Sequence, residues 1–267
     1  MFDLDEPRAT ALITGASSGI GAAFARTLAR RGYDLVLVAR REDRLRELAN
    51  ELQEGRDIHI EVLPADLGTH EGLGKVTDRI TTGGITMVVN NAGFGASGEF
   101  TEIPIERQMQ MIDVNVRAMT AVAHAALSSM KEKHRGAIIN VASTVAFQPG
   151  PYMATYAATK AYILSFTESL HEEARQHGVA VTCLSPGPVH TEFQDIAGFD
   201  MEEWPAFMFE PVERVVSEAL DAVRARRALV VPGVAPKAAM VGNRLVPRFV
   251  PRRLAALLFQ PDDEKTA

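Results

Sequence analysis

Three polar side chains in residues 143–160 have types and spacing suited to proton transfer: Ser143, Tyr156 and Lys160. Ser143 follows an apolar run at 137–141 that is typical of a buried strand, and Tyr156 and Lys160 are four residues apart in a segment of helical composition. This spacing places both side chains on one face of a helix. A hydroxyl, a phenol and an ammonium can therefore meet at the carboxyl end of a strand, where open α/β sheets bind ligands.

A tyrosine beside a lysine predicts acid–base chemistry. A free phenol has a pKa of about 10, and a nearby cation favours the phenolate, so we expect Lys160 to lower the pKa of Tyr156. Such a tyrosine can give or take a proton closer to neutral pH. The alternative is that the pair is an ordinary feature of an amphipathic helix, so the rest of the chain has to decide between them.

Length and composition limit the classes of function. The 267 residues fit one large α/β domain or two small ones, and 46% hydrophobic and 23% charged residues are typical of a globular protein. The net charge of −6 argues against a nucleic-acid partner. Cys183 is the only cysteine, so no intrachain disulfide can form, and a cytoplasmic location is expected. We expect no signal peptide, no transmembrane segment and no metal site.

Apolar runs alternate with helical stretches along the chain. Strands are predicted at 9–14, 34–39, 58–63, 86–90, 137–141, 179–184 and 228–231. Helices are predicted over 42–53, 105–133 and 210–226. Three more are predicted from the glycine-rich turn to about residue 31, from Asp66-Leu67 to about residue 80, and through Tyr156 and Lys160 to about residue 177. Because the strands alternate with helices and are continuously apolar, we expect a parallel sheet covered on both faces. The predicted fold is α/β, a Rossmann-like doubly wound parallel sheet in a single domain.

A glycine-rich turn follows the first strand, with Gly15, Gly19 and Gly21. Glycines there allow a tight turn and let a pyrophosphate approach the amino end of the next helix. The spacing Gly-x-x-x-Gly-x-Gly differs from the standard dinucleotide pattern, and plain turns also need glycine. The strand before the turn and the helix after it favour the dinucleotide interpretation.

Arg40 and Arg41 follow the second strand, where an NAD site usually places an acidic side chain. An arginine pairs with a 2′-phosphate, whereas a carboxylate would repel it, so NADP(H) is the predicted cofactor. The alternative is that both arginines are solvated residues at a helix start. Asp66 can accept a hydrogen bond from adenine or cap a helix. Asn91-Ala92-Gly93 can approach a ribose or form a simple turn.

In combination, these segments resemble the short-chain dehydrogenase/reductase family over about residues 9–191. The matching segments, in the family's order, are 14–21, Asp66-Leu67, Asn90-Asn91-Ala92-Gly93, Asn115, Ser143, Tyr156 with Lys160, and Pro186-Gly187. Residues 38–45 resemble the NADP(H)-preferring branch of the family.

The resemblance implies catalytic roles. Tyr156 would be the acid in ketone reduction and the base in alcohol oxidation, and Ser143 would polarise the substrate oxygen. Lys160 would hold the nicotinamide ribose, and Asn115 would anchor a water that relays protons, although it also reads as a polar residue within a helix. The expected cofactor-binding residues are Gly15, Ser17, Ser18, Gly19, Ile20, Gly21, Arg40, Arg41, Asp66, Leu67, Asn91, Ala92, Gly93, Tyr156, Lys160, Pro186, Gly187, Val189 and Thr191.

Residues 191–210 would form a lid over the nicotinamide. The many large apolar residues of this lid predict a hydrophobic substrate pocket, although they can also pack only against their own protein. The expected substrate contacts are Phe94, Ser143, Phe147, Tyr152, Phe193 and Trp204. We expect a ketone or secondary alcohol of moderate to large apolar bulk.

The C-terminal extension, about residues 234–267 of the single 1–267 domain, mixes basic and apolar residues. Such a segment can lie on an anionic membrane surface. Packing on a neighbouring subunit or covering the substrate pocket are the alternatives. By resemblance, a homodimer or homotetramer is expected.

The leading prediction is an NADPH-dependent carbonyl reductase. Reduction of 3-oxoacyl groups on a carrier protein is a second possibility, but the acidic net charge argues mildly against an acidic partner. A non-catalytic NADP(H)-sensing regulator is a third, and the intact Ser-Tyr-Lys set argues against it.

Overall fold

The computed structural model describes residues 9–198 and 208–259, and within them the strands form one parallel sheet of order β3-β2-β1-β4-β5-β6-β7. The strands are β1 (Thr10–Thr14), β2 (Asp34–Ala39), β3 (Ile60–Pro64), β4 (Ile85–Asn90), β5 (Gly136–Val141), β6 (Val179–Leu184) and β7 (Leu229–Val230). Four of these strands are buried almost throughout, as expected for a sheet with helices on both faces.

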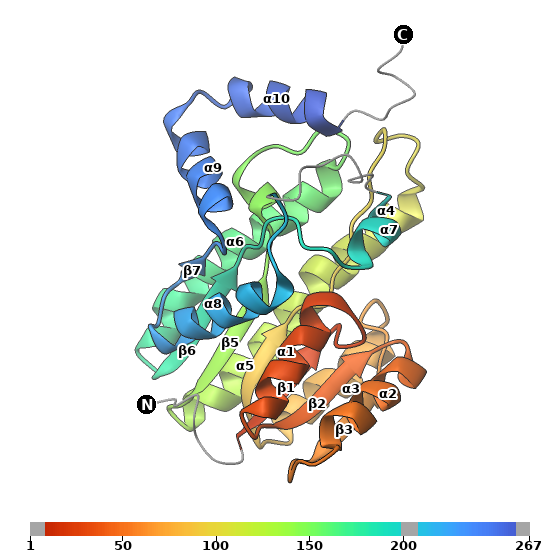
Figure 1. Ribbon diagram of the computed structural model, residues 1–267, viewed down its shortest axis with the longest axis vertical. Helices are drawn as coiled ribbons and strands as arrows, with labels where there is room; N and C mark the ends of the chain where they lie inside the picture. The colour runs from red at the N-terminus through yellow and green to blue at the C-terminus, as the bar shows by residue number, and fades with distance from the viewer. Residues whose placement is uncertain (1–8, 199–207, 260–267) are drawn as a thin grey trace.

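Two layers of helices cover the sheet (Figure 1). The helices are α1 (Gly19–Arg30), α2 (Glu42–Gln53), α3 (His70–Thr81), α4 (Ile105–Ile112), α5 (Met119–Glu132), α6 (Ala154–Arg175), α7 (Phe193–Ala197), α8 (Val212–Arg224), α9 (Val234–Leu245) and α10 (Phe249–Phe259). Helices α1, α2 and α8 share one hydrophobic cluster with one face of the sheet, and α3, α5 and α6 share another with the opposite face. The predicted doubly wound fold is confirmed.

The predicted elements differ from the structure in two ways: α7, α9 and α10 were not predicted, and one predicted helix is divided. The stretch expected as a single helix over 105–133 is divided by a π-helical segment, Asp113–Ala118, between α4 and α5. A wider helical turn of this kind often marks a functional position. None of the described helices is both long enough and apolar enough to cross a bilayer.

The strand order brings the predicted site residues together. It reverses at β1, which pairs with β2 on one side and with β4 on the other, and β5 is the next strand beyond β4. The glycine turn, Arg41, Asn91 and Ser143 follow these four strands, and parallel strands end at one edge of the sheet. Open α/β sheets bind their ligands at such a reversal.

Gly21 provides a test of how α1 packs against the turn that precedes it. A methyl group at this position would collide with the carbonyl oxygen of Gly15 and lie 2.7 Å from Asn91 Nδ2. We expect Gly21→Ala to lower the free energy of unfolding by about 1–3 kcal/mol, because the helix has to shift away from the turn. Chemical denaturation of both proteins measures the difference.

Gly74 is the matched control, because it lies within helix α3 and a methyl group there would meet nothing within 4 Å. Gly74→Ala should leave stability unchanged or raise it by about 0.5–1 kcal/mol, since alanine restricts the unfolded chain. Equal effects of the two substitutions would contradict the packing argument.

Candidate active site

A cavity of about 680 Å³ opens at the carboxyl end of the strands. Of the residues predicted to bind the cofactor, all except Gly21 line it. Of the predicted substrate contacts, four also line the cavity: Phe94, Ser143, Phe147 and Phe193. The structure therefore brings the glycine turn and the Ser-Tyr-Lys set to one continuous space.

Three of the predicted site residues in the described part of the chain do not line this cavity. Gly21 packs beneath the turn, and Asn115 is fully buried. Tyr152 lies instead against a smaller neighbouring cavity, because its backbone is left-handed (φ 61°) and its carbonyl accepts the Gly98 amide at 2.8 Å. The expectation that Tyr152 reaches the main pocket is therefore not met, and Trp204 lies outside the described residues.

The glycine turn has the features needed to hold a diphosphate. Gly15 and Gly19 have φ values of 68° and 54°, a conformation that favours glycine. Thr14 Oγ1 accepts the amides of Asn91 and Ala92, each at 2.9 Å, and so joins the ends of β1 and β4. Helix α1 begins without a side-chain cap, so its first amides remain available to an anion. These residues fit a dinucleotide.

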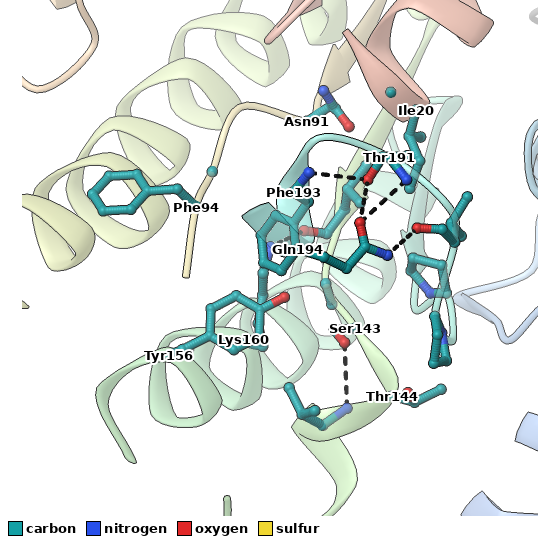
Figure 2. A pocket seen from close by; sticks show the side chains of 18 of the residues that line it. Ile20, Asn91, Phe94, Ser143, Thr144, Tyr156, Lys160, Thr191, Phe193 and Gln194 are labelled. Atoms are coloured by element: carbon teal, nitrogen blue, oxygen red, sulfur yellow. Dashed lines mark hydrogen bonds between the residues drawn. The ribbon is translucent and has the colours of Figure 1, made fainter. Parts of the chain in front are cut away.

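Ser143, Tyr156 and Lys160 face one space at the end of β5 (Figure 2). Tyr156 and Lys160 are buried on α6, and the side chains of Tyr156 and Ser143 share a hydrogen bond. Lys160 Nζ donates to the carbonyl oxygen of Val141 at 2.9 Å and lies 5.7 Å from the centre of the Tyr156 ring. The ring of Phe193, at the start of α7, lies 5.5 Å from that of Tyr156.

The expected direction of the Tyr156 pKa is wrong for the protein alone. Burial raises the pKa of Tyr156, and its hydrogen bond with Ser143 opposes this only in part. Burial also lowers the pKa of Lys160 to about 8, so the lysine charge is itself disfavoured. Loss of water around both groups is the largest cause of each shift, because desolvation disfavours the charged form of each.

Asn115 anchors the loop that follows β4. Its Oδ1 accepts the Phe94 amide at 3.1 Å, and its Nδ2 donates to the Phe94 carbonyl at 2.9 Å and to Thr159 Oγ1 at 3.1 Å. It stands within the π-helical segment, so the wider turn coincides with this bridge to α6. A methyl group at Gly93 would lie 2.9 Å from Asn115 Oδ1 and 3.6 Å from Lys160 Nζ, which makes these residues close neighbours.

An anion-binding cluster lies beside the glycine turn. Arg41 donates to Ser17 Oγ and Ser18 Oγ, each at 3.1 Å, and also to Glu192 at 2.9 Å. Arg44 donates to the other oxygen of Glu192. Hydrogen bonds from Arg44 and Arg41 hold the pKa of Glu192 below its ordinary value. Arg44 was not among the predicted residues, although it stands three positions after Arg41 at the start of a helix, where the two share a face.

Helices α9 and α10 line one part of the cavity, and these two helices are called the roof below. Ala239, Met240 and Asn243 of α9 and Leu254 and Ala255 of α10 line it. Figure 1 shows both helices in blue, together at the top of the molecule. Of the alternatives for the C-terminal region, covering the pocket agrees with these lining residues, whose individual contacts were missed because long-range packing determines them. Contact with a membrane surface stays a prediction.

The fold and the cavity define the class of protein: a dinucleotide-binding α/β protein with a serine, a tyrosine and a lysine beside the expected nicotinamide position. The family model described as short chain dehydrogenase matches residues 9–199. The chain belongs to the short-chain dehydrogenase/reductase family, whose members are oxidoreductases.

Several relatives agree with this assignment. A Staphylococcus epidermidis protein described only as an oxidoreductase is 38% identical over 191 residues, which cover 71% of this chain and 81% of the relative. A short-chain dehydrogenase from Sphingobium yanoikuyae in complex with NADPH has a TM-score of 0.81 at 36% identity, covering 89% of this chain and 94% of that one. A bulky-bulky ketone specific alcohol dehydrogenase from Comamonas testosteroni has a TM-score of 0.78 at 33% identity, with coverages of 86% and 88%.

The buried lysine makes stability depend on pH in a defined direction. The unfolded chain keeps this proton up to the ordinary pKa of 10.5, whereas the native protein loses it near 8, so the unfolded state binds more protons between these values. Stability contributed by this group therefore rises with pH in that interval. Lys160→Met removes the effect.

We expect the free energy of unfolding of the wild-type protein, relative to Lys160→Met, to increase by up to about 3 kcal/mol as pH rises through this interval. Denaturant unfolding of both proteins at a series of pH values measures it. A difference that stays constant, or falls, would contradict the argument that Lys160 is buried without a compensating anion.

Proposed function

We propose that this protein is an NADPH-dependent oxidoreductase that interconverts a ketone or aldehyde with an alcohol on a hydrophobic substrate. The observation that carries the proposal is the buried pair of Tyr156 and Lys160, with Ser143 hydrogen-bonded to the tyrosine, in the same cavity as the glycine turn. A protein that only sensed the nucleotide would need the turn and not the other three groups.

Each of the three side chains has a role that its environment supports. When bound, the nicotinamide ring supplies the hydride. The Tyr156 hydroxyl, which is protonated at neutral pH, gives its proton to the substrate oxygen. The Ser143 hydroxyl holds the same oxygen. Lys160, which lines the same cavity, holds the nicotinamide ribose, and Asn115 positions the loop after β4 through its hydrogen bonds to Phe94.

NADPH is supported as the cofactor by the charge at the end of β2. Arg40 and Arg41 line the cavity there, and Arg41 already holds the hydroxyls of Ser17 and Ser18. A guanidinium with neighbouring hydroxyls is suited to a phosphate monoester. The NADPH-bound dehydrogenase from Sphingobium yanoikuyae supports the same choice.

The cavity lining supports an apolar substrate of some bulk. Large apolar side chains line the space, among them Phe94, Phe147, Phe193, Met240 and Leu254. Such a pocket favours burial of apolar surface and has few groups to hold a charged substrate. The relative from Comamonas testosteroni, specific for bulky-bulky ketones, supports a similar preference. We also propose that 191–210 act as the lid of a single domain.

A panel of carbonyl compounds tests the proposal. Ketones with two bulky apolar substituents should oxidise NADPH with a kcat/KM at least about tenfold above that of small charged keto acids, because they bury more apolar surface. The loss of NADPH absorbance measures the rate. Faster reaction with the keto acids would overturn the substrate class.

Tyr156→Phe is the control that separates chemistry from binding. The variant should lose about 10²- to 10⁴-fold in kcat, since it removes the acid, while NADPH affinity stays within about twofold. Unchanged turnover would remove Tyr156 from the reaction.

A further inference from the structure

Glu192 lies against Arg41, one of the arginines expected to bind the cofactor. It follows Thr191 at the start of α7, and its carboxylate is bound by the guanidinium groups of Arg41 and Arg44. The contact joins the lid to the beginning of α2, across 151 residues of sequence. The same Arg41 donates through its other nitrogen to Ser17 and Ser18 of the glycine turn.

The groups around the Glu192 carboxylate are those that a phosphate monoester would use. Two guanidinium groups provide paired donors, and two hydroxyls lie beside them on the turn. Both arginines bear on one carboxylate, so the cluster keeps an excess of one positive charge. A 2′-phosphate carries up to two negative charges and balances the cluster more completely than a carboxylate does.

We propose that Glu192 is an internal counter-ion that occupies the 2′-phosphate position, and that NADP(H) displaces it and thereby releases the start of the lid. The inference rests on the proposed NADP(H) dependence and makes Arg44 part of the same specificity site. A dinucleotide without the 2′-phosphate leaves the arginine pairs in place, so it does not release this segment.

The exchange is feasible because the pairs are only partly buried. The side chains of Arg41, Arg44 and Glu192 are 37%, 40% and 41% exposed. Ion pairs at this exposure contribute little to stability, since water screens them. A ligand that brings a second charge and pairs with the same guanidinium groups can therefore replace the carboxylate.

Release of Glu192 acts on the substrate pocket through the residues next to it. The Phe193 amide donates to Thr191 Oγ1 at 3.3 Å, and the Phe193 ring is the one that lies beside Tyr156 (Figure 2). Farther along, the carbonyl of Ile196 accepts Arg107 Nη2 at 3.1 Å. Once Glu192 is released, residues 192–196 are held through the contact of Ile196 with Arg107 and no longer through Arg41 and Arg44. The position of Phe193 therefore depends on which dinucleotide is bound.

Calorimetric titration with NADP⁺ and NAD⁺ tests the inference without using turnover. Glu192→Gln keeps the shape of the side chain and removes its charge. The variant should bind NADP⁺ about three- to tenfold more tightly than the wild-type protein and NAD⁺ equally well, because only the phosphate competes with the carboxylate. Arg44→Ala should weaken NADP⁺ selectively.

Glu51→Gln is the matched control for net charge. Glu51 lies on the same helix as Arg44 and is bound by two nitrogens of Arg26, away from the cluster. The Glu51→Gln substitution removes one negative charge and leaves Arg41, Arg44 and Glu192 unchanged, so NADP⁺ affinity should not change. An equal gain in Glu51→Gln and Glu192→Gln would assign the effect to net charge and overturn the inference.

Hydrogen exchange of the amides at 192–197 provides the structural readout. In the wild-type protein, saturating NADP⁺ and NAD⁺ should give different exchange rates in this segment, and in Glu192→Gln the difference should vanish. If Arg44→Ala loses NADP⁺ selectively while Glu192→Gln changes neither affinity nor exchange, the counter-ion role is wrong and the cofactor proposal stands. If the wild-type protein binds neither dinucleotide, the proposed function itself fails.

Discussion

Exclusion of water from the end of β5 is the constraint on which the site depends. Lys160 and Tyr156 are 5% and 6% exposed, and the lysine is held by one backbone carbonyl, that of Val141. In this environment the uncharged forms of both groups are favoured, so the tyrosine keeps its proton and the lysine releases its own more readily. The site therefore presents a protonated phenol beside the Ser143 hydroxyl when no nucleotide is bound.

The rest of the chain keeps Tyr156 and Lys160 buried. The sheet brings four loops to one edge. Asn115 fixes the loop after β4, because its side chain accepts from the Phe94 amide and donates to the Phe94 carbonyl. The roof closes the opposite side, where Asn243 of α9 donates to Gln148 just after the segment that begins at Ser143. The hydrogen bonds of Arg41 and Arg44 to Glu192 join the start of α2 to the start of α7.

Local patterns in the sequence predicted much of this arrangement. Apolar runs located the strands, and the four-residue spacing of Tyr156 and Lys160 placed both on one side of α6, because these features depend on neighbouring residues. The partner of Arg41 was missed because Glu192 lies far away in sequence. The direction of the Tyr156 pKa shift was mistaken for a similar reason. The spacing in the sequence indicated the nearby lysine, but burial by elements distant in sequence determines whether the pKa is raised or lowered. Tyr152 was misplaced because its left-handed backbone has no signal in a non-glycine residue.

The protonation state of Tyr156 is the most direct test of this account. The chain has four tyrosines, so an ultraviolet difference titration of the wild-type protein against Tyr156→Phe isolates the one in question. The account predicts that, without nucleotide, Tyr156 retains its proton beyond pH 10, where a free phenol is about half ionised. Ionisation of Tyr156 well below pH 10 would show that the lysine charge outweighs burial, and would contradict the account.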